Sequence, residues 1–309
     1  MRIARVQTED GPRAGVVEGE VVRVLAAEVD VLDLLGPERE RFAGRVVGEA
    51  GLDALLAPIE PPTIRDFSVF EQHIEGAIKT SSPDAPVPAV WYERPYCYFS
   101  NPYAITGPGE DIRVAPGARL MDLELEVAAI IGREGRNLRP DAAGAHIAGY
   151  TIFNDWSARD IGGKEVQTPF GQCKGKDFAN TLGPWIVTPD ELEPWRDGDR
   201  YDLSLQAFIN GVELGRDTLA NMAWSFEQMV AYASRGTWVR PGDVLGSGTC
   251  GSGCLLELWG RRGSTQNPPP LKAGDVVTLR VEGIGELTNR LVEGFELIEL
   301  PPARTRARA

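Results

Sequence analysis

The stretch MDLELEVAAIIG, at positions 121–132, determines how the rest of the chain is interpreted. Asp122, Glu124 and Glu126 occupy alternate positions, so in a β-strand their carboxylates would share one face. Like charges about 4 Å apart near a protein surface repel one another by roughly 4 kcal/mol. A hard divalent cation with oxygen ligands would offset that repulsion. The alternative is an exposed edge strand with solvated charges, although the apolar run at 128–132 predicts burial.

The composition of the chain narrows the classes of partner. Its 309 residues are 42% hydrophobic, enough to form one large domain or a large and a small one. The net charge of −13 disfavours nucleic acid and anionic membrane surfaces. The first residues, MRIARVQTEDG, contain no apolar signal segment, and no apolar run approaches the about 18 residues of a membrane span. We therefore expect a cytoplasmic protein that binds a small molecule.

The cysteines predict no disulfide framework, because there are four of them in a long chain. Cys250 and Cys254 have the spacing of a zinc pair. Only two histidines occur in the chain, and Cys97 and Cys173 are far apart in sequence. Buried free thiols are therefore the preferred interpretation.

Three segments are expected along the chain. Residues 1–57 form a small N-terminal α+β domain for packing or dimerisation, residues 58–300 form the catalytic domain, and residues 301–309, PPARTRARA, form a disordered tail. Within the first segment, strands are predicted at 2–6, 15–18 and 20–25, and helices at 31–35 and 42–56. No side chain of this segment is expected in a site.

The larger segment carries the polar groups that interrupt its apolar elements. A strand at 148–153 is followed at once by NDWSARD at 154–160, which contains Asp155. A helix at 66–79 carries His73, and a strand at 255–259, LLELW, carries Glu257, which needs a partner if it is buried. A further amphipathic helix is predicted at 217–236. The many strands and Gly/Pro turns predict a β-rich α+β fold.

Several of these motifs occur together in the order found in a known family, and the chain resembles the fumarylacetoacetate hydrolase family from about residue 66 to residue 294. The motifs that carry the resemblance are DF and EQH within 66–73, DLELE at 122–126, NDWSARD at 154–160, GKDF at 175–178, and GSGT and LLEL within 246–258. The resemblance implies a mixed β-roll, usually a homodimer, with a small N-terminal domain in many members.

The resemblance also implies roles for individual residues. Glu124, Glu126 and Asp155 match the metal-binding carboxylates, and Asp66 matches a fourth acidic residue of the extended site. The remaining matches comprise the catalytic His73, its carboxylate partner Glu257 and the metal-adjacent Lys176, the substrate-contacting Tyr92, Arg159 and Thr249, and Asn180, where larger members have a threonine near the metal. Arg159 could instead form a surface ion pair with Asp160. Asp122 has no family role and is expected to be structural.

The implied activity is a metal-dependent hydrolysis of a C–C bond in a 1,3-diketo acid, such as an acylpyruvate or a fumarylacetoacetate-like compound from aromatic catabolism. Mg²⁺ is the expected ion, with Mn²⁺ or Ca²⁺ as alternatives. Three other interpretations remain: an isomerase of the 2-hydroxyhepta-2,4-diene-1,7-dioate type, a β-keto acid decarboxylase, and a metal-binding protein without turnover. Ser68, Ser82, Gly162 and Val166 stand where fumarylacetoacetate hydrolase has other substrate-contacting residues, which argues against fumarylacetoacetate itself.

Overall fold

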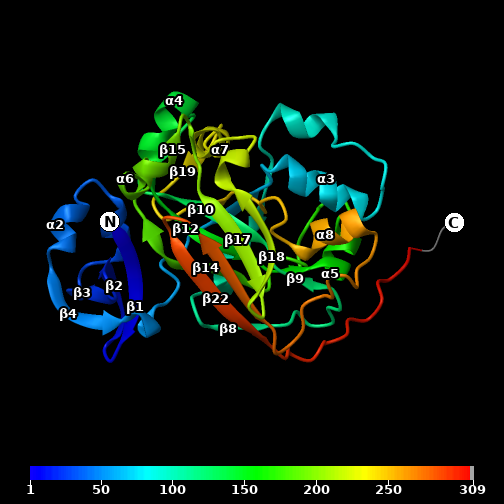
Figure 1. The fold of residues 1–309 in the computed structure, drawn as a ribbon, viewed down its shortest axis with the longest axis horizontal. Helices are drawn as coiled ribbons and strands as arrows, with labels where there is room; N and C mark the ends of the chain where they lie inside the picture. Colours follow the sequence, from blue (N-terminus) through cyan, green and yellow to red (C-terminus); the bar gives the residue numbers. More distant parts are fainter. Residues whose placement is uncertain (307–309) are drawn as a thin grey trace.

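A large sheet organises the fold (Figure 1). The computed structural model describes residues 1–306, and residues 307–309 of the tail predicted to be disordered lie outside the described part. The sheet has eleven strands, which in spatial order are β4 (Val46–Gly51), β3 (Val21–Leu25), β2 (Gly11–Glu18), β1 (Arg2–Thr8), β14 (Asn180–Val187), β12 (Ile147–Asp155), β10 (Leu125–Ile131), β20 (Val244–Gly246), β5 (Ile64–Phe67) and β6 (Cys97–Ser100), with β7 (Ile105–Thr106) beside β14.

A second sheet and several short ladders complete the strands. The second sheet has five strands in the order β18 (Val212–Thr218), β17 (Ser204–Ile209), β21 (Val276–Val281), β22 (Gly285–Val292) and β8 (Asp111–Arg113). The short ladders pair β9 (Met121–Asp122) with β13 (Ser157–Ala158), β11 (Gly135–Arg136) with β19 (Trp238–Val239), and β15 (Arg196–Asp197) with β16 (Arg200–Tyr201). Asn210 and Gly211, a residue pair typical of tight hairpins, form the β17–β18 turn, both with positive φ.

The helices are short and lie around the sheets. Residues 1–306 contain eight α-helices: α1 (Val31–Leu35), α2 (Arg39–Ala43), α3 (Glu71–Lys79), α4 (Pro140–Ala143), α5 (Arg159–Glu165), α6 (Pro189–Leu192), α7 (Phe226–Ala233) and α8 (Leu255–Arg262). Helices α3 and α8 pack against each other. The strand-rich α+β class predicted from the sequence is confirmed.

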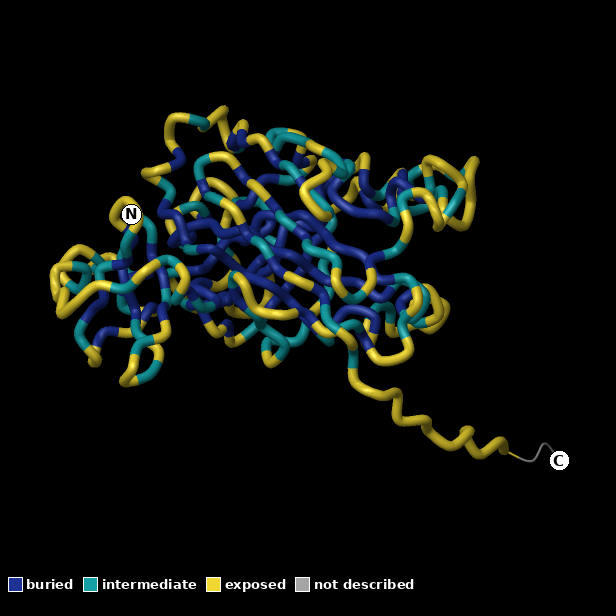
Figure 2. The backbone as a smooth tube through the Cα atoms, turned by 60° about the horizontal axis from the view of Figure 1, so that its bottom comes forward, coloured by how far each residue is buried: buried dark blue, intermediate teal, exposed yellow. Residues whose placement is uncertain are grey.

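Strand β10 lies at the centre of the large sheet, and all seven of its residues are buried. Its side chains alternate between two apolar cores: Leu125, Val127, Ala129 and Ile131 face the larger core, and Ala128 and Ile130 face the second. Figure 2 shows the buried backbone concentrated in this region, with an exposed tail leaving it. Glu126 lies on the same face of β10 as Ala128, so its carboxylate is buried at the centre of the large sheet.

The N-terminal segment continues the large sheet. Strand β1 pairs antiparallel with β14, with Arg2 opposite Val187 and Ile3 opposite Ile186. The three strands predicted there exist, and so does the helix at 31–35. The helix predicted at 42–56 is wrong: helix α2 ends at Ala43, and strand β4 follows and pairs with β3. Val47 in β4 is 67% exposed, so the apolar residues of this segment do not form a buried face of a helix.

The predicted strand at 255–259 is also wrong, because these residues begin helix α8. Leu255, Leu258 and Trp259 are buried at helical spacing, and both carboxylate oxygens of Asp122 accept hydrogen bonds from the first backbone N–H groups of the helix. Short apolar runs do not distinguish a strand from a buried helix. Asp122 favours the helix, because it accepts hydrogen bonds from backbone N–H groups that the first turn of an isolated helix would leave without a partner.

Two other helices begin later than predicted. Asp66 lies in strand β5, paired in parallel with β20, and helix α3 begins at Glu71. In the segment predicted as a helix at 217–236, strand β18 runs to Thr218, and helix α7 begins after the capping residue Ser225. In both cases sheet pairing holds residues that the apolar spacing assigned to a helix. Within residues 1–306, no helix is both long and apolar enough to span a bilayer.

Candidate active site

Four buried carboxylates from three strands converge on one place. Glu126 lies on β10, Asp155 ends β12, Asp66 lies on β5, and Glu124 immediately precedes β10. One oxygen from each of the four lies within 4.8 Å of the others. The backbone pairings produce this arrangement: β12 and β20 flank β10, and Gly246 of β20 is opposite Asp66. The strand-end aspartate and the acidic stretch therefore meet, as the sequence predicted.

A glycine makes room for the cluster. A Cβ atom at Gly246 would lie 2.6 Å from Oδ1 of Asp66 and 3.0 Å from Oε2 of Glu126, so a larger residue could not occupy this position without moving a carboxylate. The next turn also contributes, because the backbone N–H of Gly248 donates a 2.9 Å hydrogen bond to Oε2 of Glu126. The GSGT segment thus shapes and orients the cluster with backbone atoms.

The electrostatics and the hydrogen bonding of the cluster suit a bound cation. Burial raises the pKa of Glu126, and the carboxylates of Asp66 and Glu124 raise it further. Burial also raises the pKa values of Asp66 and Asp155. Within the described residues, one buried oxygen of each of Asp66, Glu126 and Asp155 has no hydrogen-bond partner. Unpartnered, convergent carboxylate oxygens are the ligands that hard divalent cations prefer, so these residues fit the metal that the sequence predicts.

Lys176 and Tyr98 complete the polar frame of the cluster. The ammonium group of Lys176 contacts Glu124 and donates a 2.6 Å hydrogen bond to Oδ2 of Asp155. Although burial lowers the pKa of Lys176, Asp155 and Glu124 raise it above its ordinary value. The hydroxyl of Tyr98 donates to Oδ2 of Asp66 at 2.7 Å and also contacts Asp155.

Tyr98 was missed as an individual residue in the sequence analysis. It lies in an aromatic stretch, and its position follows from the pairing of β5 with β6, in which Tyr98 is opposite Asp66. Only the register of that pairing identifies which tyrosine faces the carboxylates.

Asp122 and Arg159 brace the cluster from one side. Arg159 donates through Nε to Oδ2 of Asp122 at 2.8 Å and through Nη2 to Oε1 of Glu124 at 2.6 Å. Burial raises the pKa of Glu124, but Arg159 and Lys176 outweigh this effect and hold the carboxyl group ionised. Arg159 therefore lies against a cluster carboxylate rather than in a surface pair with Asp160, and Asp122 anchors helix α8. A contact of Arg159 with substrate stays a prediction.

His73 approaches the cluster from helix α3. A Cβ atom at Gly76 would lie 2.3 Å from Cγ of Glu257, and one at Gly260 would lie 1.9 Å from the backbone oxygen of Gly76, so α3 and α8 touch backbone to backbone. This contact brings Nδ1 of His73 to 3.9 Å from Oε2 of Glu257. The two residues are neighbours, but their separation is longer than a hydrogen bond, so the expected hydrogen bond between them stays a prediction for the closed site.

The protonation of this pair follows from its burial. Burial lowers the pKa of His73 to about 4, so its imidazole is neutral at pH 7. Burial raises the pKa of Glu257 to about 7, although Arg261 opposes the shift. The backbone N–H of Ser252 donates a 2.6 Å hydrogen bond to Oε2 of Glu257, which fixes that carboxylate.

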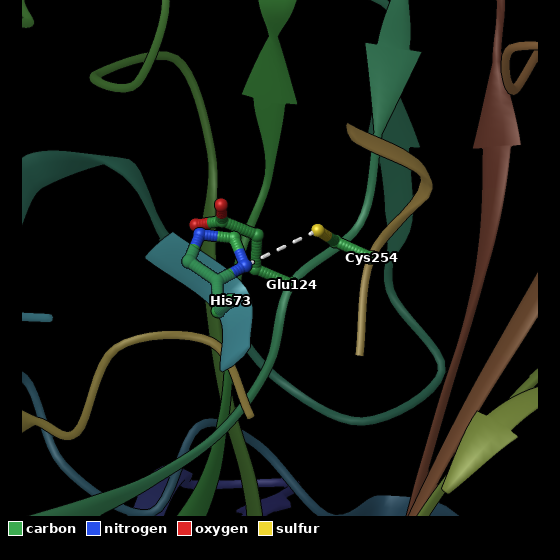
Figure 3. Close-up of side chains that lie close together, drawn as sticks. All are labelled: His73, Glu124 and Cys254. Carbon is green, nitrogen blue, oxygen red and sulfur yellow. Dashed lines mark hydrogen bonds between the residues drawn. The ribbon is translucent and has the colours of Figure 1, made fainter. Parts of the chain in front are cut away.

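Nδ1 of His73 also lies close to a sulfur. Sγ of Cys254 is 3.5 Å from Nδ1, and one ligand atom of each of His73, Cys254 and Glu124 lies within 4.8 Å of the others (Figure 3). Cys250 and Cys254 are both buried free thiols, as predicted. The contact between Cys254 and the histidine could not be predicted from the sequence, because it depends on the α3–α8 packing.

The remaining predicted residues lie at different distances from this centre. Thr249 is buried in the turn between β20 and α8, directly after the glycine that binds Glu126. Asn180 begins β14 opposite Asp155. The side chain of Tyr92 is 51% exposed, and its hydroxyl contacts Glu71. No residue of 1–57 contributes to the carboxylate cluster in the described part of the chain.

The fold and this site define a class of strand-rich α+β proteins that gather carboxylates beside a helix-borne histidine. Residues 63–292 match the family described as fumarylacetoacetate (FAA) hydrolase, C-terminal, and residues 1–58 match the Rv2993c-like N-terminal family. The chain belongs to the fumarylacetoacetate hydrolase family, which confirms the resemblance seen in the sequence. The boundary between the two matched ranges lies near the predicted domain boundary, which itself stays a prediction.

Relatives with different names resemble the chain to a similar degree. Fumarylacetoacetase of Arabidopsis thaliana is 30% identical over 72% of this chain and 66% of its own length. Mitochondrial oxaloacetate tautomerase fahd2 of Xenopus laevis is 30% identical over 77% of this chain and 68% of its own. The crystal structure of 5-carboxymethyl-2-hydroxymuconate delta-isomerase from Mycobacterium smegmatis matches with a TM-score of 0.69 and 28% identity, covering 95% of this chain and 100% of that one.

Proposed function

We propose that the chain is a divalent-cation-dependent hydrolase that cleaves a C–C bond in a 1,3-diketo acid of the acylpyruvate or fumarylacetoacetate-like type. The observation that carries the proposal is a neutral imidazole, His73, held next to Glu124 at the edge of a carboxylate cluster with unpartnered oxygens. Asp66, Glu124, Glu126 and Asp155 would hold the ion. Mg²⁺ suits an all-oxygen site, and Mn²⁺ or Ca²⁺ could replace it.

When bound, the ion would act as a Lewis acid on two chelating oxygens of the substrate. The histidine would supply the nucleophile: Nδ1 faces Glu257 and Cys254, which leaves Nε2 to take a proton from water. The resulting hydroxide would add to the carbonyl remote from the enolising carbon, and the C–C bond would break with its electron pair passing to the enolate. The imidazolium of His73 would then return its proton to the enolate carbon, which restores the neutral base. One water is consumed, and the products are a carboxylic acid and a pyruvate-like or acetoacetate-like fragment.

Other groups of the chain would hold charge in place during these steps. Glu257, fixed by Ser252, would orient His73 and stabilise the imidazolium that forms. Lys176, between Glu124 and Asp155, would stabilise negative charge that develops on substrate oxygens. Arg159 would keep Glu124 ionised for the metal.

A panel of acylpyruvates, other diketo acids and 2-hydroxy-dienedioates, each supplied with Mg²⁺ and analysed by mass spectrometry, tests this proposal. Hydrolysis gives two products whose combined mass exceeds that of the substrate by one water. The variant His73→Ala should lose hydrolysis and keep its Mg²⁺ affinity. The matched control is His146→Ala, because His146 is the other histidine and its imidazole Nδ1 forms a hydrogen bond with the backbone oxygen of Arg133.

The second candidate is an isomerase or tautomerase acting on a 2-hydroxy-dienedioate or a related keto acid. It is favoured by two proteins that resemble the chain: a tautomerase that is 30% identical to it, and an isomerase whose structure matches with 28% identity. Such a reaction moves a proton and conserves substrate mass. If the panel yields products of unchanged mass and no C–C cleavage, this candidate replaces the hydrolase.

A further inference from the structure

A second, chemically different group of ligand atoms adjoins the carboxylate cluster. It consists of Cys254, which directly precedes α8, His73 on α3, and Glu124 before β10. All three residues are buried, and one ligand atom of each lies within 4.8 Å of the others (Figure 3). Three segments far apart in sequence therefore bring a thiol, an imidazole and a carboxylate to one point.

The separation of the sulfur and the nitrogen matches that of two ligands of one tetrahedral metal ion, and a carboxylate oxygen of Glu124 lies within 4.8 Å of both ligand atoms. Zn²⁺ binds sulfur at about 2.3 Å and imidazole nitrogen at about 2.0 Å, which places two such ligands roughly 3.5 Å apart in a tetrahedron. Sγ of Cys254 and Nδ1 of His73 are 3.5 Å apart. The sulfur and the nitrogen thus have the separation they would need to bind one ion together.

The ligand chemistry separates this trio from the neighbouring cluster. Mg²⁺ and Ca²⁺ prefer carboxylate and carbonyl oxygens, whereas thiolate and imidazole select Zn²⁺ and softer ions such as Cd²⁺. The carboxylate of Glu124 belongs to both groups and could bridge two ions. Of the four cysteines, only Cys254 belongs to such a ligand group in the described residues.

Binding of an ion at this trio releases one proton. The thiolate is the form of cysteine that binds a metal, so the ion displaces the thiol proton of Cys254, which leaves to solvent.

We propose that Cys254, His73 and Glu124 form a binding site for a thiophilic divalent cation, Zn²⁺ or Cd²⁺, next to the Mg²⁺-type site. An ion bound there occupies Nδ1 of His73 and separates the imidazole from Glu257. The binding itself is independent of the reaction that the chain catalyses. Its consequence, inhibition by Zn²⁺ that holds His73 away from Glu257, rests on the proposed function.

Cd²⁺ titration of the full chain saturated with Mg²⁺ tests the binding. The readout is the ultraviolet absorbance of sulfur-to-cadmium charge transfer, which reports a thiolate ligand and requires no turnover. The wild type should develop this band with one thiolate per chain. Cys254→Ser should lose the band and weaken Zn²⁺ binding, measured by calorimetry, by more than about tenfold, since even partners of the ligands contribute that much.

Matched variants make the result specific. Cys173→Ser, at an exposed cysteine, and Cys250→Ser, at the other buried cysteine of the turn, should both keep the band. Unchanged Mg²⁺ affinity in Cys254→Ser verifies that this variant is folded. Absence of the band in the wild type, or its persistence in Cys254→Ser, overturns the proposal.

Turnover measurements separate this proposal from the proposed function. If a substrate is found, Zn²⁺ added to the Mg²⁺-loaded chain should inhibit the wild type at least about tenfold more strongly than it inhibits Cys254→Ser relative to that variant's own rate. If no substrate of the panel reacts, the proposed function fails, while the charge-transfer band still decides whether the site exists. Equal inhibition of the two proteins overturns the inhibitory role.

Discussion

The carboxylates and the histidine of the site are held in two different ways. The carboxylates stand on or beside β5, β10 and β12, where backbone ladders fix the register of each residue. The histidine stands on α3, whose position depends on its packing against α8. The register between paired strands changes only in whole residues, whereas packed helices can slide past one another by small distances. The sheet therefore fixes the carboxylates of the cation-binding half, whereas the position of His73 in the proton-transfer half is adjustable.

The largest expected effect comes from removing His73, the base in the adjustable half of the site. His73→Ala should lower turnover by about 10²–10⁴-fold, the usual contribution of a general base, because no other imidazole reaches the cluster. Mg²⁺ affinity should stay within about twofold, since His73 is not assigned to the oxygen-ligand site. Steady-state kinetics and calorimetry measure the two quantities. Turnover at the wild-type rate would remove His73 from the mechanism.

The next largest effect comes from replacing Glu126, a carboxylate in the half of the site that the sheet fixes. Glu126→Gln should weaken Mg²⁺ binding by about 10²-fold, equivalent to about 3 kcal/mol, because an amide replaces a charged ligand with nearly the same shape. Without metal, the same variant should unfold at a higher temperature than the wild type, because burial and the neighbouring carboxylates destabilise an ionised Glu126. Calorimetric titration and thermal melting in a chelator test this pair of opposite effects. A lower melting temperature without metal would contradict the repulsion argument.

A smaller effect is expected from a substitution at Gly76, where α3 contacts α8. Gly76→Ala should cost about 1–3 kcal/mol of unfolding free energy, because its Cβ atom would lie 2.3 Å from Cγ of Glu257. Turnover should fall while Mg²⁺ affinity is kept. Gly163→Ala in α5 is the control: nothing lies within 4 Å of its Cβ position, and alanine favours a helix there. Chemical denaturation compares the two variants, and equal stability would show that the α3–α8 contact is loose.

The smallest expected effect concerns pH and Glu257. Burial raises the pKa of Glu257 from 4.5 to about 7, so the folded chain holds this proton more tightly than the unfolded chain does. The stability contributed by the protonated group is therefore present below the unfolded pKa and is lost as the pH rises through about 7. Glu257→Gln should gain melting temperature relative to the wild type between about pH 5 and about pH 8. A constant difference over that range would show that Glu257 is not perturbed.

Sequence alone identified the carboxylates of the cluster because their pattern is local. The alternate spacing of Glu124 and Glu126, and the position of Asp155 after a strand, are visible in the printed residues. The matching of several motifs to one family supplied Asp66 and His73. The strand break between Asp122 and Leu125 was not predicted, although Asp122 was correctly set apart as structural.

The residues that sequence reasoning missed depend on contacts between distant segments. Tyr98 reaches the cluster through the register of β5 and β6, and Cys254 reaches His73 through the packing of α3 on α8. The helical state of LLEL follows from Asp122, more than 130 positions earlier. Local periodicity contains no information about such partners, so these features required the fold.

The direct backbone contact between Gly76 and Gly260 has a mechanical consequence. Helices that meet through interlocking side chains resist sliding, because each displacement must unseat a row of ridges from its grooves. Neither glycine presents a side-chain ridge, and the side chain of Glu257 packs directly against Gly76. A small displacement of α3 along α8 would therefore change the separation of His73 and Glu257 while the sheet that carries the carboxylates keeps its register.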